Sequence, residues 1–152
     1  MRYNLLVKRN RSIPPAQVMP VLTYPDVRAA VDWLRDTFGV TEHVFIGPNH
    51  RAQLMFGSGG IIVADAGSER AAPVAGAGET HSLMVRVDDV QAHCEHARSR
   101  GAEILREPHD WEYGERQYTV RDLAGHRWTF SQTLHDAEPE SWGGKTVAPY
   151  PS

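Results

Sequence analysis

The stretch that decides the fold runs from Thr80 to Gln132 and contains two short signatures. The first, HSLMVRVDDV at 81–90, alternates bulky apolar residues with polar ones and then reaches Asp89. This alternation is typical of a strand with one buried face, and an aspartate caps the N–H groups at the start of a helix. The second, RDLAGHRWTF at 121–130, places Asp122 and Gly125 between two extended runs, which indicates a hairpin.

The same order of elements occurs twice along the chain: a strand, a helix that begins at an aspartate and ends at a glycine, and a hairpin with glycine. The matching positions are Asp26, Gly39 and Gly60 in the first half and Asp89, Gly101 and Gly125 in the second. Each half is too small to bury a core alone, so the two halves have to pair. The sequence therefore predicts an α+β fold in which two paired βαβββ modules form a curved mixed sheet around a cavity.

The remaining segments are assigned around these two halves. The expected divisions are an N-terminal arm at 1–15, modules at 16–66 and 80–132, a linker at 67–79 and a C-terminal tail at 133–152. The linker is rich in small residues and has no periodicity. The tail is expected to be irregular, and to dock in part through Trp142, because an indole is costly to leave in water.

Composition limits the classes of function. The 152 residues are 41% hydrophobic and 23% charged, which is typical of a soluble globular protein. A net charge of −3 argues against nucleic acid as a partner. One cysteine excludes an intrachain disulfide and favours a cytoplasmic location. The apolar run near the N-terminus is too short for a membrane span, so no membrane partner is expected.

Reactive residue types on the second helix are assigned structural roles. Cys94 lies on the apolar stripe and is interpreted as a small core residue, because no basic group is placed to lower its pKa. His93 and His96 have no third metal ligand in view and are assigned to a solvated helix face.

These residues resemble the glyoxalase/bleomycin-resistance/dioxygenase superfamily, also called vicinal oxygen chelate proteins. The segment from Val87 through Gly101 to Ile104 is similar to the family's strand–helix segment. The stretch 121–130 resembles its closing hairpin, Asp-Pro-x-Gly-His-x-Trp, with Leu123 in place of the proline. The resemblance covers 16–132 and implies two βαβββ modules in a homodimer, with the modules paired within a chain or exchanged between chains.

Metal-dependent members place one ligand on the first strand and one on the last strand of each half. The resemblance transfers these positions to Met19, Ala64, Ser82 and Thr129, none of which is a good ligand for a divalent ion. His81 is one residue away, but neighbouring strand residues point to opposite faces, so it is only a weak alternative ligand. The sequence thus predicts no metal, no other cofactor and no catalytic residue, with a divalent metal as the alternative.

The same positions indicate which side chains face the cavity. The predicted ligand-binding set on the strands is Met19, Val21, Ala64, Ser82, Met84, Arg86, Gln117, Thr119 and Thr129. The alternate set is predicted to be core: Leu22, Leu83, Val85, Val87, Tyr118, Val120, Trp128 and Phe130. Trp111 and Tyr113, in a loop at 110–114, also belong to the predicted site and either cover its mouth or fold onto the protein's own surface. An inward Arg86 would be costly unless a carboxylate or an anionic ligand meets it.

Two functions compete at this stage. A glyoxalase/bleomycin-resistance-like protein would bind a small organic molecule, an aromatic or cationic natural product, without metal, and would sequester it as in antibiotic resistance. The alternative is a metal-dependent lyase, isomerase or dioxygenase of the same superfamily. The unsuitable residues at the metal-ligand positions, together with Trp111 and Tyr113, favour the binding protein over the enzyme.

Overall fold

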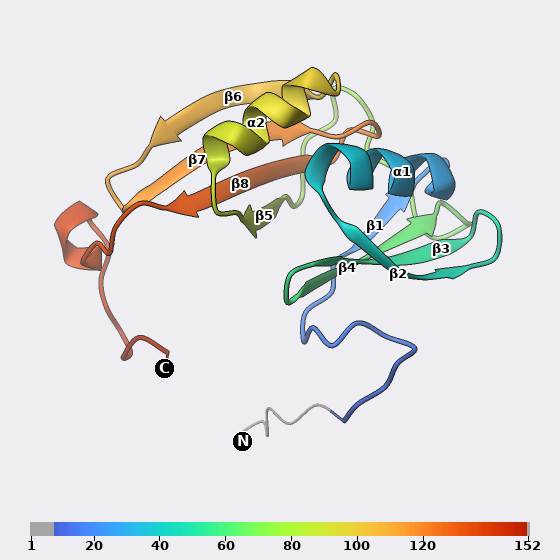
Figure 1. Ribbon diagram of the computed structural model, residues 1–152, viewed down its shortest axis with the longest axis horizontal. Helices are drawn as coiled ribbons and strands as arrows, with labels where there is room; N and C mark the ends of the chain where they lie inside the picture. Colours follow the sequence, from blue (N-terminus) through green and yellow to red (C-terminus); the bar gives the residue numbers. More distant parts are fainter. Residues whose placement is uncertain (1–7, 152) are drawn as a thin grey trace. The chain divides into compact units, whose positions relative to one another are not determined.

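A computed structural model describes residues 8–151 and divides the chain into two compact units (Figure 1). The first unit contains the described residues up to Thr80 together with Asp122–His126. The second contains His81–Arg121 and the described residues from Arg127 onward. Each unit has one α-helix and one four-stranded mixed sheet, which confirms the predicted pair of βαβββ modules.

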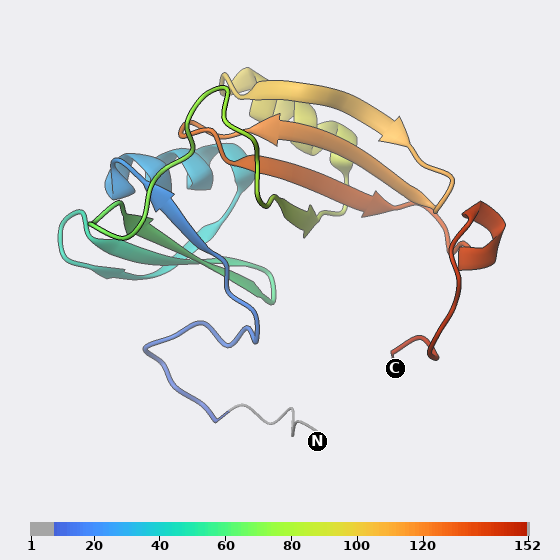
Figure 2. The same cartoon turned by 180° about the vertical axis from the view of Figure 1, so that it is seen from behind.

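The first unit follows the predicted order of elements. Its elements are β1 (Val21–Tyr24), α1 (Val27–Phe38), β2 (Thr41–Ile46), β3 (Arg51–Phe56) and β4 (Gly59–Asp65). The strand order is β1-β4-β3-β2, with β1 parallel to β4 and the other pairs antiparallel. Both views show α1 across one face of this sheet (Figure 2). Its buried residues recur at helical spacing, which is why a single stripe of α1 packs on the sheet.

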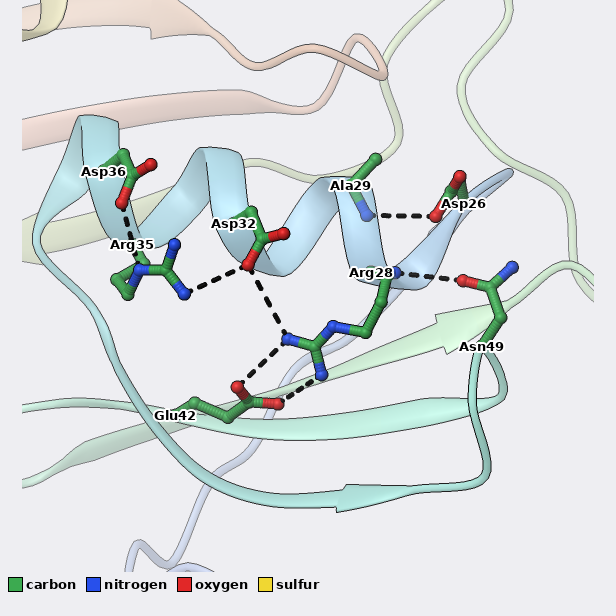
Figure 3. A network of polar contacts seen from close by, with 8 residues as sticks. All are labelled: Asp26, Arg28, Ala29, Asp32, Arg35, Asp36, Glu42 and Asn49. Carbon is green, nitrogen blue, oxygen red and sulfur yellow. Dashed lines mark hydrogen bonds and ion pairs between the residues drawn. The ribbon is translucent and has the colours of Figure 1, made fainter.

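Helix α1 begins and ends where the sequence indicates. The side chain of Asp26 accepts a hydrogen bond from the Ala29 N–H at 3.0 Å, and Gly39, with φ 79°, adopts the left-handed conformation that ends the helix. Two parallel hydrogen bonds of 2.7 and 3.0 Å join the Arg28 guanidinium to the Glu42 carboxylate on β2 (Figure 3). This two-pronged pair ties the first turn of α1 to the neighbouring strand.

The second unit repeats this topology. Its elements are β5 (Leu83–Arg86), α2 (Val90–Ser99), β6 (Glu103–Asp110), β7 (Glu115–Arg121) and β8 (Arg127–Thr133). The strand order is β5-β8-β7-β6, with β5 parallel to β8. After β8 a 3₁₀ helix, η1 (Pro139–Trp142), is the one regular element of the described part of the tail. No helix among the described residues is long and apolar enough to cross a membrane.

The predicted core residues alternate with the residues of the opposite face, as the period of two requires. Leu22, Leu83, Tyr118, Val120, Trp128 and Phe130 are buried, and Val85 and Val87 are half-buried. Phe130 stacks on Tyr118 and on Trp128, with ring centroids 5.4 and 6.3 Å apart. Trp128 has no exposed surface, so the most prominent aromatic of the hairpin motif is a core residue, as predicted.

Prolines lie at two notable places in the strands. β1 begins at Val21, directly after Pro20, which has no N–H to donate. β6 contains Pro108 and continues to Asp110. Two irregularities in the pairing of β6 with β7 allow the strand to include Pro108.

The turn between β7 and β8 is held by Asp122, as its hairpin chemistry indicates. One carboxylate oxygen accepts hydrogen bonds from the N–H groups of Ala124 and His126 at 3.0 and 2.9 Å. The other accepts the Tyr24 hydroxyl at 2.6 Å, and His126 Nε2 donates to the Thr23 carbonyl at 2.8 Å. These residues form a buried polar cluster of the first unit, so the polar residues of the motif stabilise the fold.

Candidate ligand pocket

The second unit holds a pocket of about 600 Å³ on the sheet face opposite its core. It is lined by Met84, Arg86, Tyr113, Glu115, Gln117, Ser131 and Trp142. The volume lies within the range of small-molecule sites, and the lining combines apolar and aromatic side chains with a few polar groups.

Strand register brings the floor of this pocket together. Arg86 on β5 is in register with Ser131 on β8, which in turn is in register with Gln117 on β7. Residues in register on neighbouring strands share one face of the sheet, so these three form a row. Met84 belongs to the next row, opposite Thr129.

A chain of hydrogen bonds fixes the polar part of the floor. The Tyr113 hydroxyl donates to the Gln117 side-chain carbonyl at 3.0 Å, and the Gln117 amide donates to the Ser131 hydroxyl at 3.1 Å. Ser131 donates to one oxygen of Glu115 at 2.6 Å, and Thr133 donates to the other. Both carboxylate oxygens therefore already accept a hydroxyl, and the network holds each side chain in one orientation.

Aromatic side chains form one wall of the pocket. Trp142 of η1 packs edge to face against the Tyr113 ring, with the ring centroids 5.5 Å apart. Trp111 stacks on the same Tyr113 ring, with centroids 5.9 Å apart and an interplanar angle of 5°. Trp111 does not line the pocket, and the Arg106 guanidinium lies over its ring at 5.5 Å. Burial, and next the charge of Glu115, raise the pKa of Tyr113, so its hydroxyl stays protonated at neutral pH.

Arg86 stands apart from the hydrogen-bond network. Its side chain is exposed at the pocket, and within residues 8–151 its guanidinium makes no hydrogen bond or ion pair. All five of its N–H donors face solvent or a ligand.

The predicted site residues of the second unit all lie on or beside this pocket face. Met84, Arg86, Tyr113 and Gln117 line the pocket. Thr119 and Thr129 follow on the same face, with their hydroxyl oxygens 3.3 Å apart. Ser82 is exposed and precedes β5. Their roles in ligand binding remain predictions.

The predicted site residues of the first unit lie outside this pocket. Val21 is 47% exposed at the start of β1, whereas Ala64 on β4 is fully buried. Met19 lies beside Gly60, where an added Cβ would approach its side chain at 3.4 Å. None of these three residues is among those that line the pocket of the second unit.

Sequence reasoning did not place Glu115, Ser131 and Trp142 at the site, although it expected the tail to dock through Trp142. The first two could have been found from the period of two, because Glu115 lies two residues before Gln117 and Ser131 lies two residues after Thr129. Trp142 gave no such signal, because the tail has no periodic pattern that places it.

An N-terminal segment covers the corresponding face of the first sheet. The Gln53 amide donates to the Ser12 carbonyl at 2.9 Å, and Pro14 is buried. At Gly60, an added Cβ would lie 3.0 Å from the Pro14 Cβ. The absence of a side chain at Gly60 thus lets the arm lie close against the sheet.

The residues at the metal-ligand positions do not fit a catalytic metal centre. Between residues 8 and 151 no group of three or more His, Cys, Asp or Glu side chains is placed to hold a metal ion. Thr129 lies opposite Met84, and His81 is exposed ahead of β5. A catalytic zinc site normally has three protein ligands.

Two residues of α2 have structural roles, one of them unexpected. His93 is half-buried, which corrects its assignment to a solvated face: its ring lies 4.2 Å from that of Phe130, and its Nδ1 shares a hydrogen bond of 2.7 Å with the Tyr118 hydroxyl. Burial raises the pKa of Tyr118, so its hydroxyl stays protonated at neutral pH. Cys94 is fully buried and burial raises its pKa, so the thiol is a core group, as predicted.

The solved structures most useful for comparison include one with substantial sequence identity. TioX from Micromonospora sp. ML1 is 35% identical, with a TM-score of 0.61 over 77% of this chain and 99% of its own. A glyoxalase/bleomycin resistance protein/dioxygenase from Nocardioides is 20% identical, with a TM-score of 0.59 over 88% of this chain and 89% of its own. Lactoylglutathione lyase from Agrobacterium tumefaciens is 20% identical, with a TM-score of 0.59 over 78% of this chain and 95% of its own. The last two show a shared fold alone.

Sequence comparison identifies the family. A search of curated proteins found no match. Residues 16–130, which are most of the chain, match the profile of the Glyoxalase/Bleomycin resistance protein/Dioxygenase superfamily. The protein therefore belongs to the glyoxalase/bleomycin resistance protein/dioxygenase superfamily.

Proposed function

We propose that this protein binds a small organic molecule with a flat ring in the pocket of the second unit and sequesters it unchanged. The observation that carries the proposal is the pocket's lining, in which large apolar side chains remain open to solvent: Met84 is 67% exposed and Trp142 is 37% exposed. Burial of apolar surface stabilises a complex by about 25 cal/mol per Å², so a ring that packs against Met84 and Trp142 would bind favourably.

The polar groups of the pocket are suited to orienting a ligand. The protonated Tyr113 hydroxyl is a hydrogen-bond donor rather than a base at neutral pH. The Glu115 carboxylate accepts two hydroxyl groups of the protein, which hold it in place. Fixed donors and acceptors beside an aromatic wall are typical of a site that holds a small molecule in one orientation.

Capture of an antibiotic is the biological role that this chemistry fits best. The name of the family includes bleomycin resistance proteins, and resistance in this protein would come from stoichiometric capture of the antibiotic rather than from its turnover. An aromatic natural product matches the wall formed by Tyr113 and Trp142. Binding of this kind requires no metal, in agreement with the residues at the metal-ligand positions.

Fluorescence titration tests the proposal, because Trp142 lies in the pocket. The full chain, treated with a chelator, is titrated with a panel of aromatic antibiotics. We expect saturable quenching with one ligand per chain, lost in Trp142→Leu. The matched control is Trp33→Leu, because Trp33 packs against Phe38 at the end of α1 in the first unit; this variant should bind as the wild type does.

The opposite result would favour the enzyme. If no member of the panel quenches the fluorescence, and added divalent metal stimulates turnover of a hemithioacetal or a catechol, the sequestration proposal is wrong. The metal-dependent lyase or dioxygenase would then be the better account.

A further inference from the structure

We infer that the ligand of this pocket carries an anionic group, a carboxylate or a sulfonate, next to its flat ring, and that Arg86 binds this anion. The inference rests on the proposed function, which supplies the ring-binding pocket. It goes further by assigning the charge of the ligand and the residue that recognises it.

Arg86 differs from several other arginines of the same protein in its lack of a carboxylate partner. Those with a carboxylate partner include Arg28 with Glu42, Arg98 with Glu107, Arg116 with Asp110 and Arg121 with Glu103. Arg86 makes no such pair within residues 8–151, although it lines a concave pocket together with a carboxylate, that of Glu115. Its donors are therefore available at the place where a ligand would bind.

Glu115 is already hydrogen-bonded within the protein. Its carboxylate lies on the same pocket, and each of its two oxygens accepts one hydroxyl hydrogen bond, from Ser131 or from Thr133. The distance between the Glu115 carboxylate oxygens and the Arg86 guanidinium nitrogens exceeds 4.0 Å, the limit for an ion pair. A cationic ligand would meet a carboxylate that is already hydrogen-bonded, whereas an anionic ligand would meet a guanidinium with every donor available. The balance of unmet hydrogen bonds therefore favours the anion.

The geometry of the pocket also suits an anion attached to a ring. Arg86 projects from β5 in register with Ser131 and Gln117, both of which are buried and hydrogen-bonded. The pocket that this row lines also contains Tyr113 and Trp142. A planar guanidinium pairs with a carboxylate or sulfonate through two parallel hydrogen bonds, and the adjacent rings provide a stacking surface. One molecule with an anion attached to a ring satisfies both parts of the pocket.

The test uses three chemical probes that share one ring system and carry an anionic, a neutral or a cationic substituent: naphthalene-2-carboxylate, naphthalene-2-carboxamide and naphthalen-2-ylmethylammonium. Each is titrated calorimetrically into the full chain, into Arg86→Gln and into Arg121→Gln. The second variant is the matched control, because Arg121 is an arginine of the same sheet whose partner is Glu103. Both variants remove one positive charge.

We expect the wild type to bind the carboxylate about tenfold more tightly than the carboxamide, the effect of one charge-assisted contact. Arg86→Gln should lose this preference, and a circular dichroism spectrum like that of the wild type shows that the variant is folded. Arg121→Gln should keep the preference. Added salt should weaken binding of the carboxylate more than that of the carboxamide.

Each other result contradicts a defined part of the account. Equal binding of carboxylate and carboxamide by the wild type overturns the inference about Arg86 and leaves the ring-binding pocket intact. Tightest binding of the ammonium probe, lost in Glu115→Gln, makes the pocket a cation site and also overturns it. If the wild type binds none of the three probes, the proposed ring-binding function fails and the inference fails with it.

Discussion

Tyr24 shows how one buried residue gives the hairpin motif its structural role. It is fully buried in the first unit, and its hydroxyl donates to the Asp122 carboxylate at 2.6 Å. Its ring also lies 4.8 Å from that of His126. A buried carboxylate needs its hydrogen bonds, so these residues depend on one another.

Removing the Tyr24 hydroxyl should destabilise the protein measurably. Tyr24→Phe leaves the buried Asp122 oxygen without this donor, and we expect the free energy of unfolding to fall by about 1.5–3 kcal/mol, the contribution of a hydrogen bond to a charged group. Urea unfolding followed by circular dichroism measures the change. Tyr150→Phe is the control, because Tyr150 is 90% exposed and its change should stay below about 0.5 kcal/mol. Equal effects of the two substitutions would contradict this role of Tyr24.

Two buried tyrosines also predict a sensitivity to alkaline pH. Burial is the largest cause of the raised pKa of both Tyr24 and Tyr118, and the Asp122 charge further raises that of Tyr24. Above the ordinary pKa of 10.0 the unfolded chain loses these protons while the folded protein keeps them. The free energy of unfolding is therefore undiminished below that pH and decreases as the pH rises above it.

Unfolding in urea at pH values between about 8 and about 11 measures this decrease. Tyr24→Phe removes one of the two groups, so its stability should depend less steeply on pH above 10.0 than that of the wild type. A free energy of unfolding that stays constant over this range would show that the two phenols titrate normally in the folded protein.

At the scale of elements, the turn between β6 and β7 connects the pocket to the tail. Gly114 has φ 82°, and its carbonyl accepts the Leu134 N–H at 2.8 Å. A Cβ at Gly114 would lie 2.3 Å from the His135 carbonyl oxygen, a distance too short for any contact. Only glycine allows the chain after β8 to pass this close to the turn that carries Tyr113, and Trp142 reaches the pocket from that chain.

A pair of glycine substitutions isolates this contact. Gly101 also has φ 82° but nothing within 4 Å of an added Cβ, so Gly101→Ala measures the backbone cost alone, about 1–2 kcal/mol. Gly114→Ala adds the clash with His135. We expect it to lower the free energy of unfolding further and to change the fluorescence of Trp142, which Gly101→Ala should leave unchanged. Identical behaviour of the two variants would show that the tail does not depend on the turn.

The sequence predicted the elements better than it predicted their alignment. The caps at Asp26 and Asp89 and the apolar alternation depend on local chemistry, and they were sufficient for the fold. Counting from the hairpin glycines, Gly60 and Gly125, aligned Ala64 with Thr129. The observed pairing of β1 with β4, compared with that of β5 with β8, instead aligns Ile62 with Thr129. The reason is that the two hairpin turns differ in length, residues 57–58 in one and 122–126 in the other.

The candidate site was predictable only where strand periodicity decides orientation. Met84, Arg86 and Gln117 reach the pocket because every second strand residue faces the same way. Trp142 reaches it through the approach of the tail to the Gly114 turn, a contact between distant parts of the chain that no local pattern encodes.

At the scale of the whole molecule, two units with the same topology present different faces. The Ser12–Pro14 segment lies on the first sheet, where Gln53 binds it, whereas the second sheet has an aromatic-walled pocket on the corresponding face. The internal repeat therefore gives two similar scaffolds, and the side chains on this face of each sheet determine whether it packs against the chain itself or forms a pocket.

Family membership leads us to expect a homodimer, with modules paired within a chain or exchanged between chains. Light scattering coupled to size-exclusion chromatography should give a mass near twice the 17.0 kDa of one chain. Association of this kind should persist on dilution, because shared modules bury a large interface. A mass of one chain at all concentrations would contradict the expected assembly.

The claim that the second unit contains the ligand site is tested most directly by the methyl signals of the methionines in a carbon-13-labelled protein. Met84 lines the pocket, whereas Met55 lies on β3 of the first unit, and Met84→Leu assigns the signal. On titration with naphthalene-2-carboxylate, we predict that the Met84 signal shifts with saturation while the Met55 signal stays in place. A saturable shift of Met55 with no change at Met84 would contradict the central claim.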